Sequence, residues 1–209
     1  MSRLLRAVSV VVVALAMLGA TGATVLWLRE GGTSTATGPR DLDGRAVALD
    51  DAPGDAVRGR AAGRFEAPRQ GLDVPLVELA VTGTELVPPT FTDAFLVDGP
   101  ADADAAGERP VVVAMHALRE GRAPGNAFFE DGAADPAVTV RAGDPLVVDG
   151  VAYTVTRTEV LAKSAAARSA DVWAAQPGGS ERLVVITCLQ RAGASGPAAE
   201  NLLVHAART

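Results

Sequence analysis

The sequence predicts a mostly β protein: a closed or nearly closed barrel of about six to eight short strands with short helices, preceded by one N-terminal transmembrane helix. Short apolar runs rich in valine recur from residue 65 onward, and Gly, Pro, Asp and Ser separate them. Only one stretch in that region, 165–173, suggests a helix. Many short strands with little helix are typical of a β-barrel.

The composition indicates how large the folded part is and which classes of partner it excludes. The chain has 209 residues, of which 48% are hydrophobic and 4% aromatic, which suits one domain with a real core and some non-core sequence. From residue 65 to the end, 11 basic and 19 acidic residues give a net charge of 11 − 19 = −8. The basic residues form no block, so we expect no nucleic acid as a partner.

The N-terminus, residues 1–30, has the pattern of a membrane anchor. Ala7 to Leu28 runs for 22 residues without a charge, long enough to cross a hydrocarbon core of ~30 Å as a helix. Arg3 and Arg6 precede this run, so the positive-inside rule places the rest of the chain outside the cytoplasm. A cleaved signal peptide is the alternative, because small residues at 19–23 offer a peptidase site. The apolar run continues past that site to Trp27, which favours a retained anchor.

The next segment, 31–64, is rich in Gly, Thr, Ala, Asp, Arg and Pro and shows no sustained apolar periodicity. It predicts a flexible extracytoplasmic linker, because such a segment buries too little surface to offset its ordering entropy. We therefore expect the folded domain to span 65–209.

Within 65–209 the apolar runs predict the strands in order. Pro75, inside the first of them, suggests an edge or an irregular start. Asp149-Gly150 stands between two runs and is a strong signal for a two-residue hairpin. The predicted strands are 72–76, which 79–81 may continue, then 91–97, 111–115, 137–140, 146–148, 151–160, 183–187 and 201–206.

Two side chains at strand ends are the candidates for chemistry. Cys188 is the only cysteine, and an apolar strand delivers it at its C-terminal end. A lone cysteine is more often a small buried hydrophobe, but an unpaired one in an exported domain is a candidate reactive thiol. His116 closes the run 111–115, and the other histidine, His205, lies inside the last strand, where packing is its expected role. These residues lack the short ligand spacing of a zinc site, so we expect no metal and no cofactor.

The combination of motifs resembles the sortases, the membrane-anchored cysteine transpeptidases of Gram-positive bacteria. The resemblance covers roughly 65–206. It is carried by Val-Val-Val-Ala-Met-His, Arg-Ala-Gly-Asp-Pro-Leu-Val-Val, Val-Ile-Thr-Cys and Leu-Leu-Val-His-Ala. The stretch 121–129 after the histidine is most similar to the class E and F enzymes of actinobacteria. In class E-like sequences an arginine stands where the final strand begins, and here that position is Asn201.

The resemblance implies a site and a reaction. Cys188 would attack the Thr carbonyl of a signal similar to Leu-Pro-x-Thr-Gly or Leu-Ala-x-Thr-Gly and form a thioacyl-enzyme. His116 would protonate the leaving amine and then activate an amine acceptor of the cell wall or a pilin. Arg191, three residues after the cysteine, is the expected oxyanion donor. The protein would be a single-pass membrane protein that anchors surface proteins, with its catalytic domain extracytoplasmic.

Two other functions use the same residues. A cysteine peptidase would release the acyl-enzyme to water, and a non-catalytic sortase-like module would bind its target without reacting. For the oxyanion donor, Arg119 and Arg122 are the next candidates, while Arg182 lies at the far end of the cysteine strand.

Overall fold

The computed structural model describes residues 38–47, 59–80, 86–98, 108–176 and 181–209. These belong to one compact unit, Gly38–Thr209. The predicted anchor, 1–30, lies outside the described residues, as do residues 31–37 and 48–58 of the predicted linker. None of the helices in the described ranges has the length and apolar character needed to cross a lipid bilayer.

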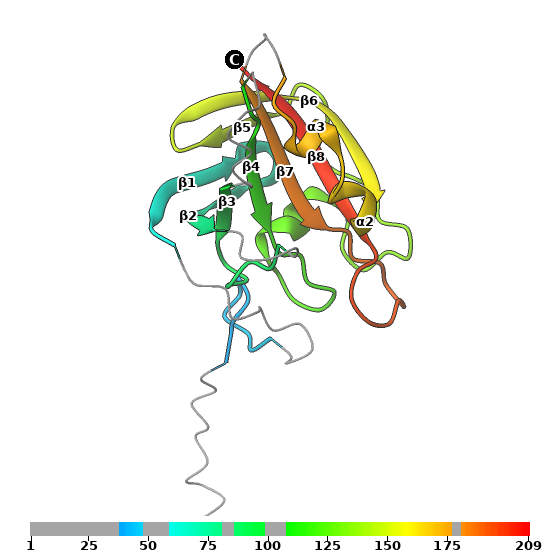
Figure 1. Cartoon of the computed structure of the whole chain (residues 1–209). Coiled ribbons are helices and arrows are strands. Elements are labelled where there is room, and N and C mark those ends of the chain that lie inside the picture. Colours follow the sequence, from blue (N-terminus) through cyan, green and yellow to red (C-terminus); the bar gives the residue numbers. More distant parts are fainter. Residues whose placement is uncertain (1–37, 48–58, 81–85, 99–107, 177–180) are drawn as a thin grey trace, which may run out of the picture. The chain divides into compact units, whose positions relative to one another are not determined.

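Eight strands of the described chain form a closed barrel in the order β1-β2-β3-β4-β7-β8-β6-β5, which confirms the predicted mostly β barrel (Figure 1). Pairing of β1 with β5 closes it, and only β2–β3 and β4–β7 are parallel neighbours. The strands are β1 (Ala61–Ala67), β2 (Leu72–Ala80), β3 (Ala94–Asp98), β4 (Val111–Met115), β5 (Pro145–Val148), β6 (Val151–Ala162), β7 (Arg182–Cys188) and β8 (Glu200–Arg208).

The barrel begins earlier than the sequence pattern indicates. Strand β1 starts at Ala61, inside the segment predicted as linker, because its first residues pair with β2 through the backbone and carry no apolar alternation that would reveal a strand. Residues 38–47 are also held by contacts. The amide of Leu42 donates to the carbonyl oxygen of Arg122 at 2.7 Å, and Val47 packs against a small buried cluster of Phe91, Leu118 and Ala123.

Other predicted elements appear with shifted bounds. The predicted helix 165–173 is two short helices, α2 (Lys163–Ala166) and α3 (Ala170–Trp173), and the sequence pattern did not reveal the short 3₁₀ helices η2 (Pro68–Gln70) and η3 (Pro124–Phe128). The run 137–140 is not a strand; one isolated bridge joins Val138 to Phe129. Pro75 is accommodated because pairing of β2 with β3 begins only at Leu76.

The hairpin prediction is confirmed at Asp149-Gly150, which joins β5 to β6. Asp149 has φ 47° and Gly150 φ 78°. Positive φ at both central residues is the geometry of a type I′ turn, whose twist matches that of the flanking strands.

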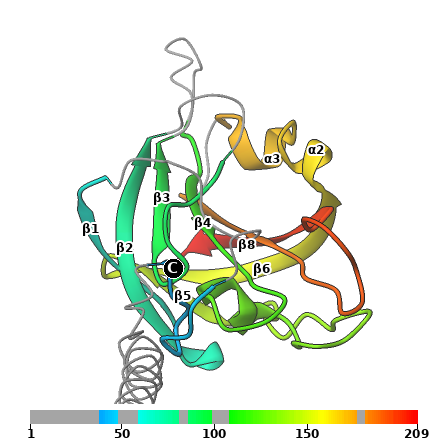
Figure 2. The same cartoon turned by 90° about the horizontal axis from the view of Figure 1, so that it is seen from below.

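Strand side chains alternate between two apolar layers. One set fills the barrel interior, with Val113 and Met115 of β4 beside Leu183 and Val185 of β7. The other set faces outward and packs against α2 and α3, which lie outside the barrel (Figure 2). Both faces of β4 and β7 are therefore buried, which is why these strands read as unbroken apolar runs.

Candidate active site

His116 and Cys188 lie at the same end of two neighbouring parallel strands. The register of β4 with β7 ends with the pair Met115 and Thr187, so the next residues are His116, which directly follows β4, and Cys188, the last residue of β7. Figure 1 shows the two arrowheads at one end of the barrel. Because adjacent strands lie about 4.8 Å apart, parallel pairing brings together two residues that are 188 − 116 = 72 positions apart.

The two residues also continue one face of the sheet. Ala114 and Ile186 are register partners in the outer apolar layer. Side chains two apart on a strand share a face, so Cys188 lies on the face of Ile186 and His116 continues the face of Ala114. Cys188 is a free, partly buried thiol. Adjacent strand ends are where a thiol and an imidazole would have to lie to exchange a proton in a nucleophilic reaction.

The ring of His116 is held by the segment between β2 and β3. Its Nε2 lies 2.8 Å from the carbonyl oxygen of Pro88, and its ring centroid is 4.5 Å from that of Phe91. A carbonyl oxygen only accepts hydrogen bonds, so Nε2 carries a proton in this arrangement.

The backbone after His116 is fixed by η3. The amide of Gly125 donates to the carbonyl oxygen of His116 at 2.8 Å. Buried Asn126 closes the intervening loop, because its Oδ1 accepts from the amides of Leu118 and Ala123 at 2.9 Å each. Its Nδ2 donates to the carbonyl oxygen of Leu118 at 2.8 Å. Sequence reasoning missed these supports, since nothing local to Asn126 shows what it will contact.

The loop after Cys188 is bonded to the loop after His116. Gln190 donates from Nε2 to the carbonyl oxygen of Ala117 at 2.9 Å. Arg119 donates to the carbonyl oxygen of Gly196 at 2.9 Å and lies 3.4 Å from Gln190 Oε1. These contacts hold the two reactive strand ends in a fixed relation.

Arg191 lies in the loop after β7, where two carboxylates hold its guanidinium. Nε and Nη2 each lie 2.9 Å from Oε2 of Glu200, and Nη1 lies 2.5 Å from Oδ1 of Asp135. The hydrogen bonds that Arg191 donates to Asp135 and Glu200 raise the pKa of Arg191 above its usual value. To bind an oxyanion, Arg191 would have to exchange one of these carboxylates for it.

The alternative arginines occupy different places. Arg122 ion-pairs with Asp43 at 3.4 Å on the surface. Arg182 is the first residue of β7 and donates to carbonyl oxygens of Asp171 and Ala174, so the length of the strand, about 20 Å at ~3.3 Å per residue, separates it from Cys188. Of these arginines, Arg119 alone among the described residues has a side chain that contacts the loop that follows the cysteine.

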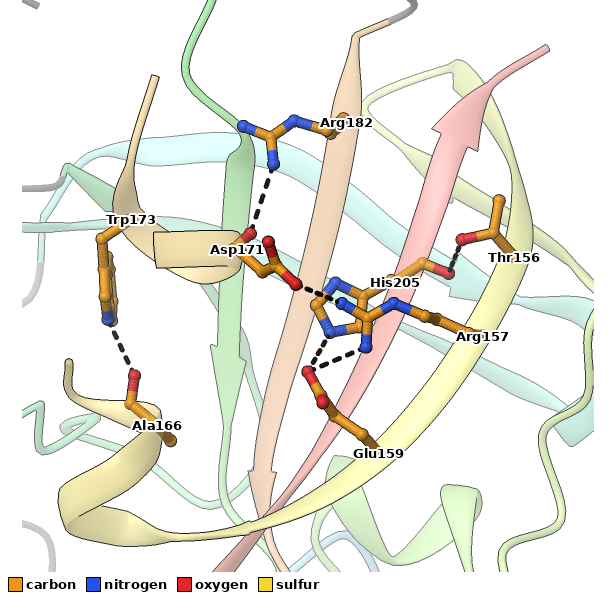
Figure 3. A network of polar contacts seen from close by, with 8 residues as sticks. All are labelled: Thr156, Arg157, Glu159, Ala166, Asp171, Trp173, Arg182 and His205. Carbon is orange, nitrogen blue, oxygen red and sulfur yellow. Dashed lines mark hydrogen bonds and ion pairs between the residues drawn. The ribbon is translucent and has the colours of Figure 1, made fainter. Parts of the chain in front are cut away.

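The second histidine belongs to a separate polar network on the outer face, shown in Figure 3. His205 is buried, and its Nε2 lies 2.8 Å from Oε1 of Glu159. Arg157 contacts Glu159 at 2.9 Å and Asp171 of α3 at 2.8 Å, which fastens α3 to β6. His205 is paired with Val184, four residues before Cys188 on β7. Its contacts are structural, in agreement with the packing role expected for it.

No protein-family model and no curated protein matches the chain. Among solved structures it is similar to sortase C1 from Streptococcus suis, with 17% identity, 72% of this chain and 73% of that one covered, and a TM-score of 0.49. It is also similar to sortase A from Corynebacterium diphtheriae (20% identity, 74% and 63% covered, TM-score 0.49). A third similar structure is sortase A from Listeria monocytogenes (18% identity, 71% and 87% covered, TM-score 0.46).

Proposed function

We propose that this protein is a sortase-type cysteine transpeptidase, of the class E or F kind, with its catalytic domain outside the cytoplasm and an N-terminal membrane anchor. The observation that carries the proposal is the adjacency of His116 and Cys188 at the ends of two parallel strands. Two of the four motifs that resemble sortases, Val-Val-Val-Ala-Met-His and Val-Ile-Thr-Cys, end at these two strand ends. Its substrates are proteins with a sorting signal similar to Leu-Pro-x-Thr-Gly or Leu-Ala-x-Thr-Gly.

The proposed reaction has two halves. The Cys188 thiolate bonds to the Thr carbonyl carbon, the carbonyl electron pair moves to oxygen, and collapse of this intermediate breaks the Thr–Gly C–N bond. Protonated His116 gives its proton to the departing amine, which leaves a thioester on Cys188. An amine of the cell wall or a pilin then attacks the thioester carbonyl and loses a proton to His116, and the carbon–sulfur bond breaks to release the Cys188 thiolate. Arg191 is the proposed oxyanion donor, on exchanging Glu200 for the substrate.

A peptide assay tests the reaction. The full chain, in detergent or liposomes, is mixed with a peptide containing either signal, and the Cys188 adduct is measured by intact mass. We expect an adduct in the wild type, none in Cys188→Ala, and slow formation in His116→Ala. Arg191→Ala should lower acylation by about two orders of magnitude, the usual effect of removing one oxyanion donor.

The product distinguishes the alternatives. Transfer to an added amine supports the transpeptidase, whereas release of a free acid despite excess amine would identify a peptidase. If the wild type binds the peptide but forms no adduct, the binding module replaces the proposal. The ion pairs of Arg191 with Glu200 and Asp135 are the observation that favours this module.

The topology needs its own test. Protease added to intact cells stripped of their wall should digest the domain containing Cys188 while a cytoplasmic marker stays intact. Protection of that domain would contradict an extracytoplasmic location.

A further inference from the structure

Asn201 lies directly across from Cys188 on the neighbouring strand. In the antiparallel pairing of β7 with β8, Cys188 is the register partner of Asn201. Residues directly opposite each other on such strands have Cβ atoms about 4.5–5.5 Å apart. His116, Cys188 and Asn201 therefore follow one another across β4, β7 and β8, at one end of the barrel.

The side chain of Asn201 is on the reactive face and has spare donors. Leu202 points into the barrel interior and Leu203 into the outer layer, so alternation puts Asn201 on the outer face with Cys188. Asn201 is partly buried. Within the described chain no hydrogen bond joins its side-chain amide to another residue, and that amide carries two N–H donors.

The nearby cations are engaged elsewhere. Arg191 is held by Glu200 and Asp135, and Arg119 donates to the carbonyl oxygen of Gly196. A side-chain amide is an established kind of oxyanion donor, because its N–H dipole is already oriented when negative charge develops on the carbonyl oxygen.

We propose that the Asn201 side-chain amide donates a hydrogen bond to the oxyanion formed when Cys188 attacks a carbonyl. This deepens the proposed function and rests on Cys188 being its nucleophile. The sulfur–carbon bond forms, the carbonyl π pair moves to oxygen, and Asn201 Nδ2 binds that oxygen until the pair returns and the leaving group departs. Asn201 would act beside Arg191 or in its place.

The test uses two reagents that Cys188 attacks in different ways. p-Nitrophenyl acetate reacts through a tetrahedral oxyanion, whereas iodoacetamide alkylates sulfur by displacement at a saturated carbon and forms no oxyanion. Both are measured on the full chain, with Cys188→Ala subtracted as background. Neither reagent needs a sorting signal. If the wild type formed no adduct with the sorting peptide, the proposed function would be overturned, but the proposed role of Asn201 would still be decided by these two reagents.

Asn201→Ala should slow acylation by p-nitrophenyl acetate about 100-fold, with a lower kcat and an unchanged KM, and leave alkylation by iodoacetamide at the wild-type rate. Asn201→Asp should be slower still, because it keeps the shape but opposes the oxyanion with a carboxylate. Acylation within about threefold of wild type in Asn201→Ala would overturn the proposal. So would an equal loss of acylation and alkylation, which would mean that Asn201 acts on the thiol. A wild-type Cys188 that reacts with iodoacetamide but not with the ester would overturn it too.

Discussion

The amide of Gly125 donates to the carbonyl oxygen of His116, and the same glycine lies against Thr187, the residue before Cys188. A Cβ on Gly125 would lie 1.9 Å from Thr187 Oγ1 and 2.7 Å from the His116 carbonyl oxygen. Gly125→Ala should therefore displace the backbone at one or both strand ends. We expect a loss of about 1–3 kcal/mol in unfolding free energy and a 10- to 100-fold slower acylation of Cys188, measured by urea unfolding and adduct mass.

Gly38→Ala is the matched control, because a Cβ there meets nothing within 4 Å. It should leave both stability and acylation near wild-type values. A Gly125→Ala protein as stable and as reactive as the wild type would show that the packing of η3 does not position His116.

Thr187 offers a test in the opposite direction. Its hydroxyl oxygen is buried and has no hydrogen-bond partner within the described residues. Burying an unpaired hydroxyl costs free energy. The unfolding free energy of Thr187→Val should therefore be higher than that of the wild type or at most about 0.5 kcal/mol lower. Chemical denaturation measures this. A loss above about 1.5 kcal/mol would mean that the hydroxyl has a partner in solution.

Asp41 ties the segment 38–47 to the loop after His116. Its carboxylate accepts from the amides of Asp43, Arg45 and Arg122 at 3.0, 2.8 and 3.1 Å. Burial alone would raise the pKa of Asp41, but these backbone hydrogen bonds outweigh it and lower the pKa. Asp41→Ala leaves those amides without their acceptor, so we expect a loss of about 2–3 kcal/mol in unfolding free energy at pH 7.

Asp43→Ala is the control for Asp41→Ala. Asp43 forms ion pairs with Arg45 at 3.7 Å and Arg122 at 3.4 Å at a partly exposed position, so it should cost about 0–1 kcal/mol. Because the lowered pKa makes ionised Asp41 stabilising, the difference between wild type and Asp41→Ala should shrink as pH falls below ~3.8. Equal losses for the two variants would contradict this role for Asp41.

The strands around the site could be predicted because their signal is local. β4 and β7 are buried on both faces, so each is an unbroken apolar run, and the residue closing each run is visible in the sequence. The parallel pairing of β4 with β7 could not be predicted, since the apolar periodicity of a sequence does not indicate which strands are neighbours. The hairpin at Asp149-Gly150 was predictable because the turn itself requires those residue types.

The elements that escaped prediction depend on distant contacts. Strand β1 begins with residues that pair with β2 through the backbone and carry no apolar alternation. The roles of Gly125 and Asn126 follow from packing against His116 and its loop. The contacts of Arg191 with Asp135 and Glu200 likewise join two separate loops and the first residue of β8, so sequence spacing from the cysteine could not reveal them.

The His205 network predicts how stability depends on pH. Burial lowers the pKa of His205 and outweighs the opposing effect of the hydrogen bond that His205 donates to Glu159. Arg157 lowers this pKa further, and Asp171 raises it. The folded state therefore holds His205 neutral at pH values where the unfolded chain, with a pKa of ~6.5, already binds a proton. As pH falls below ~6.5, the unfolding free energy should decrease, and the decrease should end below the lowered pKa of the folded state.

Glu159 acts in the same direction at lower pH. Burial opposes its ionisation, but hydrogen bonds from Arg157 and His205 lower its pKa overall, so its stabilisation is lost as pH falls below ~4.5. The measurement is the unfolding free energy from urea titrations between pH 8 and pH 4 for wild type, His205→Gln and His116→Gln. The chain has only these two histidines. We expect His205→Gln to reduce the slope just below pH 6.5 and His116→Gln to retain it; the reverse would assign the slope to the histidine beside Cys188.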